Sequence, residues 1–163
     1  MSIISYMSPS RVMNIYKDNS VDTPNISFTV ISSVATGTSG TKIVDTSVDF
    51  IAAGVQTGDI VYDYTSRRVD TVSEVVSRTE LESTFGWVIS GDTYKIFSAA
   101  NAGGGVLLVD DFTTSGLQQI MTIGGDIVQV AIEEWGQIVP IRTKRVYRTT
   151  GTTASCSFVM IWD

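Results

Sequence analysis

The sequence contains no histidine and only one cysteine, Cys156, in 163 residues. Without histidine there is no Ser-His or Cys-His nucleophile pair, no His-based zinc site and no usual general base for neutral pH. One thiol forms neither an intramolecular disulfide nor a thiolate zinc cluster. Because Cys156 lies in an apolar strand pattern, we interpret it as a buried thiol. We therefore expect a protein that is not an enzyme and that uses no cofactor and no metal.

Leucine is also scarce, with four residues, whereas valine and isoleucine together number 37 and threonine and serine 39. β-Branched side chains are stiff and fit a pleated sheet better than a helix. The composition therefore predicts an all-β fold class. No apolar run approaches the ~18 residues of a membrane-spanning helix. Residues 1–6 lack the basic and apolar regions of a signal peptide, so we expect a protein made in the cytoplasm without membrane contact.

Basic residues are few and unevenly placed in a chain of net charge −6. A non-specific nucleic-acid binder needs a cationic surface, so we expect no nucleic-acid partner. Residues 1–141 hold seven basic and sixteen acidic residues, but four of the eleven basic residues gather in one stretch: Arg142, Lys144, Arg145 and Arg148. This basic stretch is either a solvated strand face or an interface that meets an acidic neighbour.

The positions of proline and glycine residues predict the boundaries between the parts of the chain. We expect an N-terminal arm or edge element over 1–25, a small β-barrel over 26–98, a glycine-rich linker over 99–105 and a C-terminal β unit over 106–163. The C-terminal unit is expected to be sandwich-like, and the N-terminal arm extended. A chain of this length suits one ordinary domain or two very small ones.

Period-2 alternation predicts short strands separated by turn residues. The expected strands are 26–32, 42–45, 59–64, 69–76, 85–89, 93–97, 106–109, 117–123, 126–133, 137–147 and 154–162. Residues 47–54 break the alternation and predict one helical turn with a glycine cap at Gly54. Trp135-Gly136 and residues 149–152 are each expected to close a hairpin.

Carboxylate pairs and aromatic residues are the remaining candidates for a site. Asp110-Asp111 and Glu133-Glu134 are adjacent on extended chain, where neighbours point to opposite faces, so neither pair predicts a two-acid catalytic site. Asp110 with Asp126, or Asp45 with Asp49, lack the alternating acidic ligands of a calcium loop. The tryptophans Trp87, Trp135 and Trp162 are either a sugar-stacking platform or core and interface anchors.

The last expected strand places Cys156, Phe158, Met160 and Trp162 on one apolar face, which belongs in a core or an interface. Together with the basic stretch, this face gives the candidate interface residues: Arg142, Lys144, Arg145, Arg148, Phe158 and Trp162.

One segment carries a recognisable motif. Residues 42–62 match the pattern (L/I)-V-D-(S/T)-x-x-D-F-x-x-A-G-V-x-x-G-D-x-V, and alternating Val and Thr at 70–76, Thr-x-Leu at 79–81 and Ser-Gly-Asp-x-Tyr-x-Ile at 90–96 follow it. This resembles a small β-barrel module of tailed-bacteriophage virion proteins that occurs in decoration, neck and tail components. The resemblance covers about residues 36–98, and nothing in 105–163 is familiar.

The resemblance implies a structural protein of a virion, most simply a capsid decoration or cement protein that works in many copies. A neck or tail component, or a carbohydrate- or receptor-binding module, is the alternative. The implied partners are copies of itself and the major capsid protein or neck and tail proteins. Phe50 and Val55 would plug one end of the barrel, and Ile60, Tyr62, Tyr94 and Ile96 would line it. The chain departs from the pattern at Ser66-Arg67-Arg68, where the familiar form often has Thr-Asp-Gly.

Overall fold

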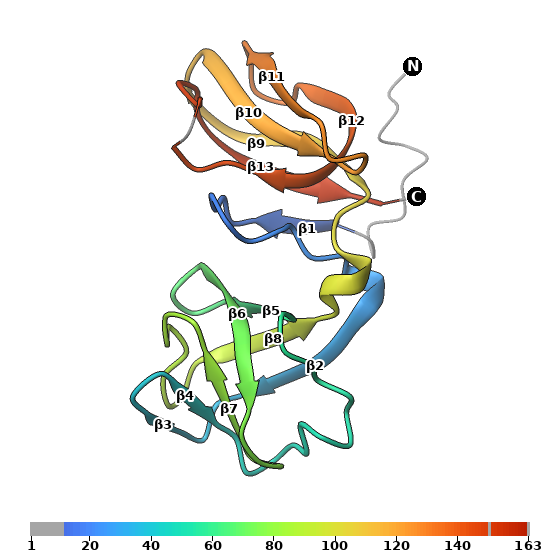
Figure 1. The fold of residues 1–163 in the computed structure, drawn as a ribbon. Helices are drawn as coiled ribbons and strands as arrows, with labels where there is room; N and C mark the ends of the chain where they lie inside the picture. The colour runs from blue at the N-terminus through green and yellow to red at the C-terminus, as the bar shows by residue number, and fades with distance from the viewer. Residues whose placement is uncertain (1–11, 150, 163) are drawn as a thin grey trace. The chain divides into compact units, whose positions relative to one another are not determined.

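The computed structural model describes residues 12–149 and 151–162 (Figure 1). Strands dominate, and the helices among these residues are two short 3-10 helices, η3 (Ile26–Phe28) and η4 (Ala99–Asn101). The predicted all-β class is confirmed. The chain forms two compact units: unit 2 spans Phe28–Ala102, and unit 1 combines the residues up to Ser27 with those from Gly103 onward.

Unit 2 is one seven-stranded antiparallel sheet with the order β2-β8-β5-β6-β7-β4-β3. Its strands are β2 (Thr29–Val34), β3 (Gly37–Ser39), β4 (Lys42–Val44), β5 (Ile60–Asp63), β6 (Arg68–Val75), β7 (Glu80–Ser83) and β8 (Thr93–Phe97).

The two edge strands of this sheet, β2 and β3, follow each other in the chain with only Ala35 and Thr36 between them. Two linking residues span at most about 11 Å, whereas seven flat strands would be about 29 Å wide. The sheet must therefore curl until its edges meet at these residues. The strand ladder itself does not close within the described residues, so the expected small barrel is a curled, open sheet.

A capped helical turn lies between β4 and β5, as the break in alternation predicts. Asp49 begins it, because its carboxylate accepts the backbone N–H of Ala52 at 2.9 Å. Gly54 ends it at φ +79°, and the N–H of Val55 donates to the carbonyl of Phe50 at 3.1 Å, the hydrogen bond of a Schellman cap. Phe50 and Val55 are both buried in the core, so the cap and the core form together.

The core of unit 2 lies inside the curl. It is formed by the inward residues of the strands and the capped turn: Ile31, Ala35, Ile43, Phe50, Val55, Val61, Val72, Leu81, Val88, Tyr94 and Ile96. Ile60 and Tyr62 are buried as well, and the Tyr62 ring meets Phe97 edge-on at 5.8 Å. All four residues of β5 are buried, and this strand lies between β8 and β6 in the sheet.

The strand expected over 85–89 is wrong. The strand in this region is β7, at Glu80–Ser83, and residues 85–89 form an extended loop. Gly86 has φ +65°, which breaks a pleated strand. The buried carboxylate of Asp70 also accepts the N–H groups of Phe85 and Gly86, at 3.0 and 3.1 Å, that a ladder would otherwise use. The alternation of 85–89 therefore reflects a loop that is held by a side chain.

Unit 1 is a six-stranded antiparallel sheet with the order β1-β13-β9-β12-β10-β11. Its strands are β1 (Val12–Ile15), β9 (Gly105–Thr114), β10 (Gly116–Thr122), β11 (Ile127–Ile132), β12 (Ile138–Val146) and β13 (Ser155–Ile161).

Both hairpins expected in unit 1 are wrong. The chain does turn at Trp135-Gly136, but β10 lies between β11 and β12. It turns again near residues 149–152, but β9 lies between β12 and β13. Turn residues show where a chain changes direction and not which strand it pairs with. The hairpin among these C-terminal strands is β10–β11.

The N-terminal segment belongs to unit 1. Residues 1–11 lie outside the described residues, but β1 forms an edge of the sheet against β13, and residues 16–24 run beside β12. The N–H of Thr23 donates to the carbonyl of Lys144 at 2.8 Å, and that of Asp18 to Val146 at 3.1 Å. We call residues 16–24 the strap.

The glycine triplet expected as part of a linker is packed into unit 1 instead. A Cβ on Gly103 would lie 2.7 Å from the Cα of Lys144, and one on Gly105 would lie 2.5 Å from Cγ of Met160. Both glycines are buried, and Gly105 is the first residue of β9. Glycine permits close approach as well as flexibility, and the sequence alone does not distinguish the two.

Candidate interaction surfaces

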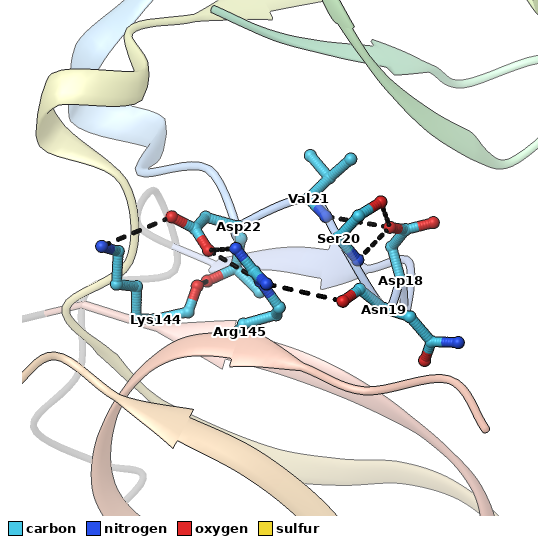
Figure 2. Close-up of polar contacts among 8 residues, drawn as sticks. Asp18, Asn19, Ser20, Val21, Asp22, Lys144 and Arg145 are labelled. Atoms are coloured by element: carbon cyan, nitrogen blue, oxygen red, sulfur yellow. Dashed lines mark hydrogen bonds and ion pairs between the residues drawn. The ribbon is translucent and has the colours of Figure 1, made fainter. Parts of the chain in front are cut away.

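The basic stretch lies on β12 and just beyond it, where the structure separates its four members. Arg142 and Arg148 are exposed, whereas Lys144 and Arg145 are half-buried beneath the strap. Figure 2 shows the reason: Asp22 of the strap accepts from Arg145 at 2.6 Å and 2.8 Å and lies 3.6 Å from the Lys144 ammonium. Two of the four basic side chains therefore meet an acidic neighbour within their own unit.

The strap is folded to make this contact. The Asp18 carboxylate accepts the N–H groups of Ser20 and Val21 at 2.7 and 2.9 Å, which bends the chain into a tight turn (Figure 2). The turn places the backbone carbonyl of Asn19 3.4 Å from Arg145. The Asn19 side chain accepts the N–H of Arg148 at 3.0 Å. The basic stretch thus anchors the N-terminal segment onto β12.

The two aromatic members of the candidate interface lie in the interior of unit 1. Phe158 is 1 % exposed, and the Lys17 ammonium lies 5.0 Å from its ring centroid. Trp162 is 5 % exposed, and its indole N–H donates to the carbonyl of Gly103 at 3.3 Å. Their strand face is therefore a core face rather than a surface offered to another chain.

Cys156 is half-buried beside Lys17, whose ammonium lies 3.6 Å from the sulfur and 2.8 Å from the side-chain oxygen of Gln118. Burial raises the pKa of the Cys156 thiol, Lys17 opposes the rise and Asp111 adds to it. Burial lowers the pKa of Lys17, and Cys156 opposes that change. A thiol with a raised pKa carries little thiolate near neutral pH, so Cys156 is a poor nucleophile.

The buried carboxylates of unit 2 are engaged in holding turns. Asp45 is fully buried and accepts from Ser47 and from the Tyr94 hydroxyl at 2.8 Å. Asp59 accepts the N–H groups of Gln56 and Ala99 at 2.9 and 3.1 Å. No cluster of three or more potential metal ligands occurs among the described residues.

An exposed aromatic surface on unit 2 is a feature of which the sequence analysis singled out Trp87 alone. Phe85 and Trp87 stack with ring centroids 5.7 Å apart and are 51 % and 37 % exposed, and Ile89 beside them is 55 % exposed. The guanidinium of Arg68 lies 4.1 Å from the Trp87 ring centroid. We call Arg67, Arg68, Phe85, Trp87 and Ile89 the aromatic ridge. Phe-Gly-Trp is the signal that was available, because Gly86 disrupts the strand that would have paired these residues.

The ridge is held rigidly from below. Asp70, which is 1 % exposed, accepts from the backbones of Phe85, Gly86 and Thr71. Val88 is 1 % exposed and belongs to the core, so Trp87 and Ile89 on either side of it face outward. The backbone that carries the aromatic rings is therefore tied to Asp70 and to the core of unit 2.

Comparison with protein-family models, with curated proteins and with solved structures finds no match to this chain. Within the described ranges, no helix is long and apolar enough to cross a membrane.

Proposed function

We propose that this chain is a non-enzymatic structural protein of a bacteriophage virion, and in the first place a capsid decoration or cement protein present in many copies. A neck or tail component of the same particle is the close alternative position. The virion setting rests on the resemblance of residues 42–62 to the phage module.

The observation that carries the assembly part of this proposal is the aromatic ridge. Tryptophan and arginine are the residues that most often dominate protein–protein binding energy. Exposed aromatic rings on a fixed backbone are suited to docking, because little conformational entropy is lost when they bind. Unit 2 therefore offers a preformed contact surface of the kind that a repeated structural subunit needs.

The engaged carboxylates support the non-enzymatic part. General acid or base catalysis needs a carboxyl group within reach of a substrate. Asp45, Asp59 and Asp70 are buried and accept hydrogen bonds from backbone or hydroxyl groups of their own unit. Their role in the chain is to fix turns.

Quantitative mass spectrometry of purified virions tests the proposal. A decoration protein is expected at hundreds of copies per particle, a neck protein at about a dozen and a tail protein in between, because each place imposes its own symmetry. Absence of the chain from purified virions would refute the proposal.

A carbohydrate-binding module is the second candidate, and the exposed Phe85 and Trp87 rings favour it specifically. Sugar rings stack on aromatic faces, and Arg68 adds a donor beside them. A glycan array with the purified chain tests this function, with Trp87→Ala as the ridge variant and Trp135→Ala, on unit 1, as the matched control. Binding lost in the first variant alone would favour the carbohydrate reading over assembly.

A further inference from the structure

The aromatic ridge carries positive charge as well as apolar surface. Arg67 lies exposed in the turn between β5 and β6, and Arg68 is the first residue of β6. Ion pairs in the described part of the chain involve other side chains, namely Lys42 with Glu80, Arg78 with Asp49, and Lys144 and Arg145 with Asp22. Within the described part of the chain, the two arginines of the ridge therefore have no carboxylate partner, and Arg68 lies over the exposed Trp87 ring.

Unit 1 carries a surface of the opposite charge around another exposed aromatic residue. Trp135 is 71 % exposed, and its indole N–H donates to the carbonyl of Asp110 at 2.7 Å, which fixes the ring. Asp110, Glu133 and Glu134 are exposed as well, and the two glutamates directly precede Trp135 in the chain. We call Asp110, Glu133, Glu134 and Trp135 the acidic corner. Its three carboxylates take no part in the ion pairs named above.

The acidic corner is held in place by its own sheet. The N–H of Gly136 donates to the carbonyl of Val109, and that of Val109 to Gln137, both at 2.9 Å. The Gln137 side chain also accepts the N–H of Glu133 at 2.8 Å. The backbone beneath these side chains is therefore tied to β9, so the corner, like the ridge, is ordered before it meets a partner.

We propose that the aromatic ridge of one copy docks on the acidic corner of a second copy of this chain. Charge complementarity identifies the occupant: the ridge carries two exposed arginines, the corner carries three exposed carboxylates, and each surface includes an exposed tryptophan. A guanidinium is attracted both to a carboxylate and to an indole face. The inference rests on the proposed function, because it supplies the contact through which the copies assemble.

This contact joins two different surfaces, so it is heterologous. Each copy that uses its ridge still has a free corner, and the association continues to the next copy. Such contacts close into rings when the rotation allows and otherwise form open filaments. Symmetric rings and repeating arrays are the arrangements in which a many-copy structural protein is used.

Charge reversal of each surface tests the inference on the full chain. Variant A carries Arg67→Glu and Arg68→Glu, and variant B carries Glu133→Lys and Glu134→Lys. Analytical ultracentrifugation is expected to show concentration-dependent association of the wild-type chain. Its Kd should rise at least about tenfold when the salt concentration is raised from about 50 to 500 mM. Each variant alone should be monomeric.

The mixture of the two variants is the decisive sample. Variant A keeps a native corner and variant B a native ridge, so the mixture should associate although neither component does. A control with Arg142→Glu and Arg148→Glu has the same charge change as variant A and should associate like the wild type. Unfolding midpoints of all three variants establish that they are folded.

Three results would each overturn the inference: a wild-type chain that stays monomeric at about 0.5 mM, a mixture that fails to associate, or a control that dissociates as variant A does. None of them depends on virions. If the chain self-associates by this contact but is absent from virions, the inference stands and the proposed function is refuted. If the chain is present in virions but monomeric in solution, the proposed function stands and the inference is refuted.

Discussion

The hydrogen bond from Tyr94 to Asp45 is the best internal test of how unit 2 is held together. Both side chains are fully buried, and the phenol oxygen lies 2.8 Å from the carboxylate. Burial, followed by the hydrogen bond to Asp45 and the negative charge of that carboxylate, raises the pKa of Tyr94 above its ordinary value, so the phenol keeps its proton and donates. Replacing Tyr94→Phe removes the donor and leaves the buried carboxylate with one partner fewer.

The expected cost is about 2–3 kcal/mol of unfolding free energy at pH 7, the range for a buried hydrogen bond to a charged group. Urea unfolding of Tyr94→Phe, Asp45→Asn and the double variant measures it as a coupling energy, which removes the effects that each substitution has by itself. A coupling energy below about 0.5 kcal/mol would show that the bond contributes little, and that packing of the Tyr94 ring accounts for its burial.

The stability difference between the wild type and Tyr94→Phe should depend on pH, and the pKa of Asp45 determines in which direction. Burial by itself would raise the pKa of Asp45, but hydrogen bonds from Ser33, Ser47 and Tyr94 outweigh it and hold the pKa below its ordinary value. A carboxyl whose pKa is lowered in the folded state stabilises the fold above its unfolded pKa of about 4, and this contribution is lost as the pH falls through the folded value. The advantage of the wild type over Tyr94→Phe should therefore be complete at pH 7 and shrink below pH ~4. An advantage that is unchanged at low pH would contradict an ionised acceptor.

Two glycine substitutions and one double-mutant cycle test separate parts of the structure by urea unfolding. Gly54→Ala should cost about 1 kcal/mol, because φ is +79° but no atom lies within 4 Å of the new Cβ. Gly86→Ala should cost about 3 kcal/mol, because φ is +65° and the new Cβ would lie 2.7 Å from a backbone atom of Thr41; equal costs would mean that the loop beneath the ridge gives way freely. A double-mutant cycle of Asp22→Asn with Arg145→Gln should give a coupling energy of about 1–2 kcal/mol, since the pair is short and about four-fifths buried; additive effects would show that the strap is held by its backbone hydrogen bonds alone.

The class and most of the strand positions could be predicted because alternation is a local property. The strands expected over 117–123 and 137–147 coincide closely with β10 and β12. Which strands pair is not local, and there the prediction failed: β10 separates β11 from β12, although the chain passes directly from one to the other. No turn residue at Trp135-Gly136 records the strand that enters between them.

The environment of the candidate interface residues also depends on contacts between residues that are distant in the sequence. The cluster of charge at Arg142–Arg148 is visible in the sequence, but Asp22, which neutralises Arg145, is 123 residues away. Likewise, the sequence of the apolar face with Phe158 and Trp162 is equally compatible with a core and with an interface, because it does not show which residues cover that face. Trp87 was a candidate from the sequence, but the rest of the aromatic ridge was not predicted, because the alternation of 85–89 resembles a strand that Asp70 and Gly86 prevent.

The residues of the recognisable motif divide according to where they lie. Asp49, Phe50 and Gly54 build the capped turn, and Asp45 and Asp59 hold neighbouring turns through hydrogen bonds inside unit 2. Each of these positions is explained by the fold alone, so the motif reports how unit 2 folds and not what it touches.

The residues at which the chain departs from the motif are exposed, unlike most of the motif residues that build or hold the turns. Ser66-Arg67-Arg68 is exposed, Arg67 adopts φ +57°, and Arg68 lies against the Trp87 ring. A shared scaffold acquires its own partners through its exposed loops, because changes there leave the core intact. The two arginines at this turn are exposed and lie outside the core, so reversing their charge should change the proposed assembly while leaving the fold unchanged.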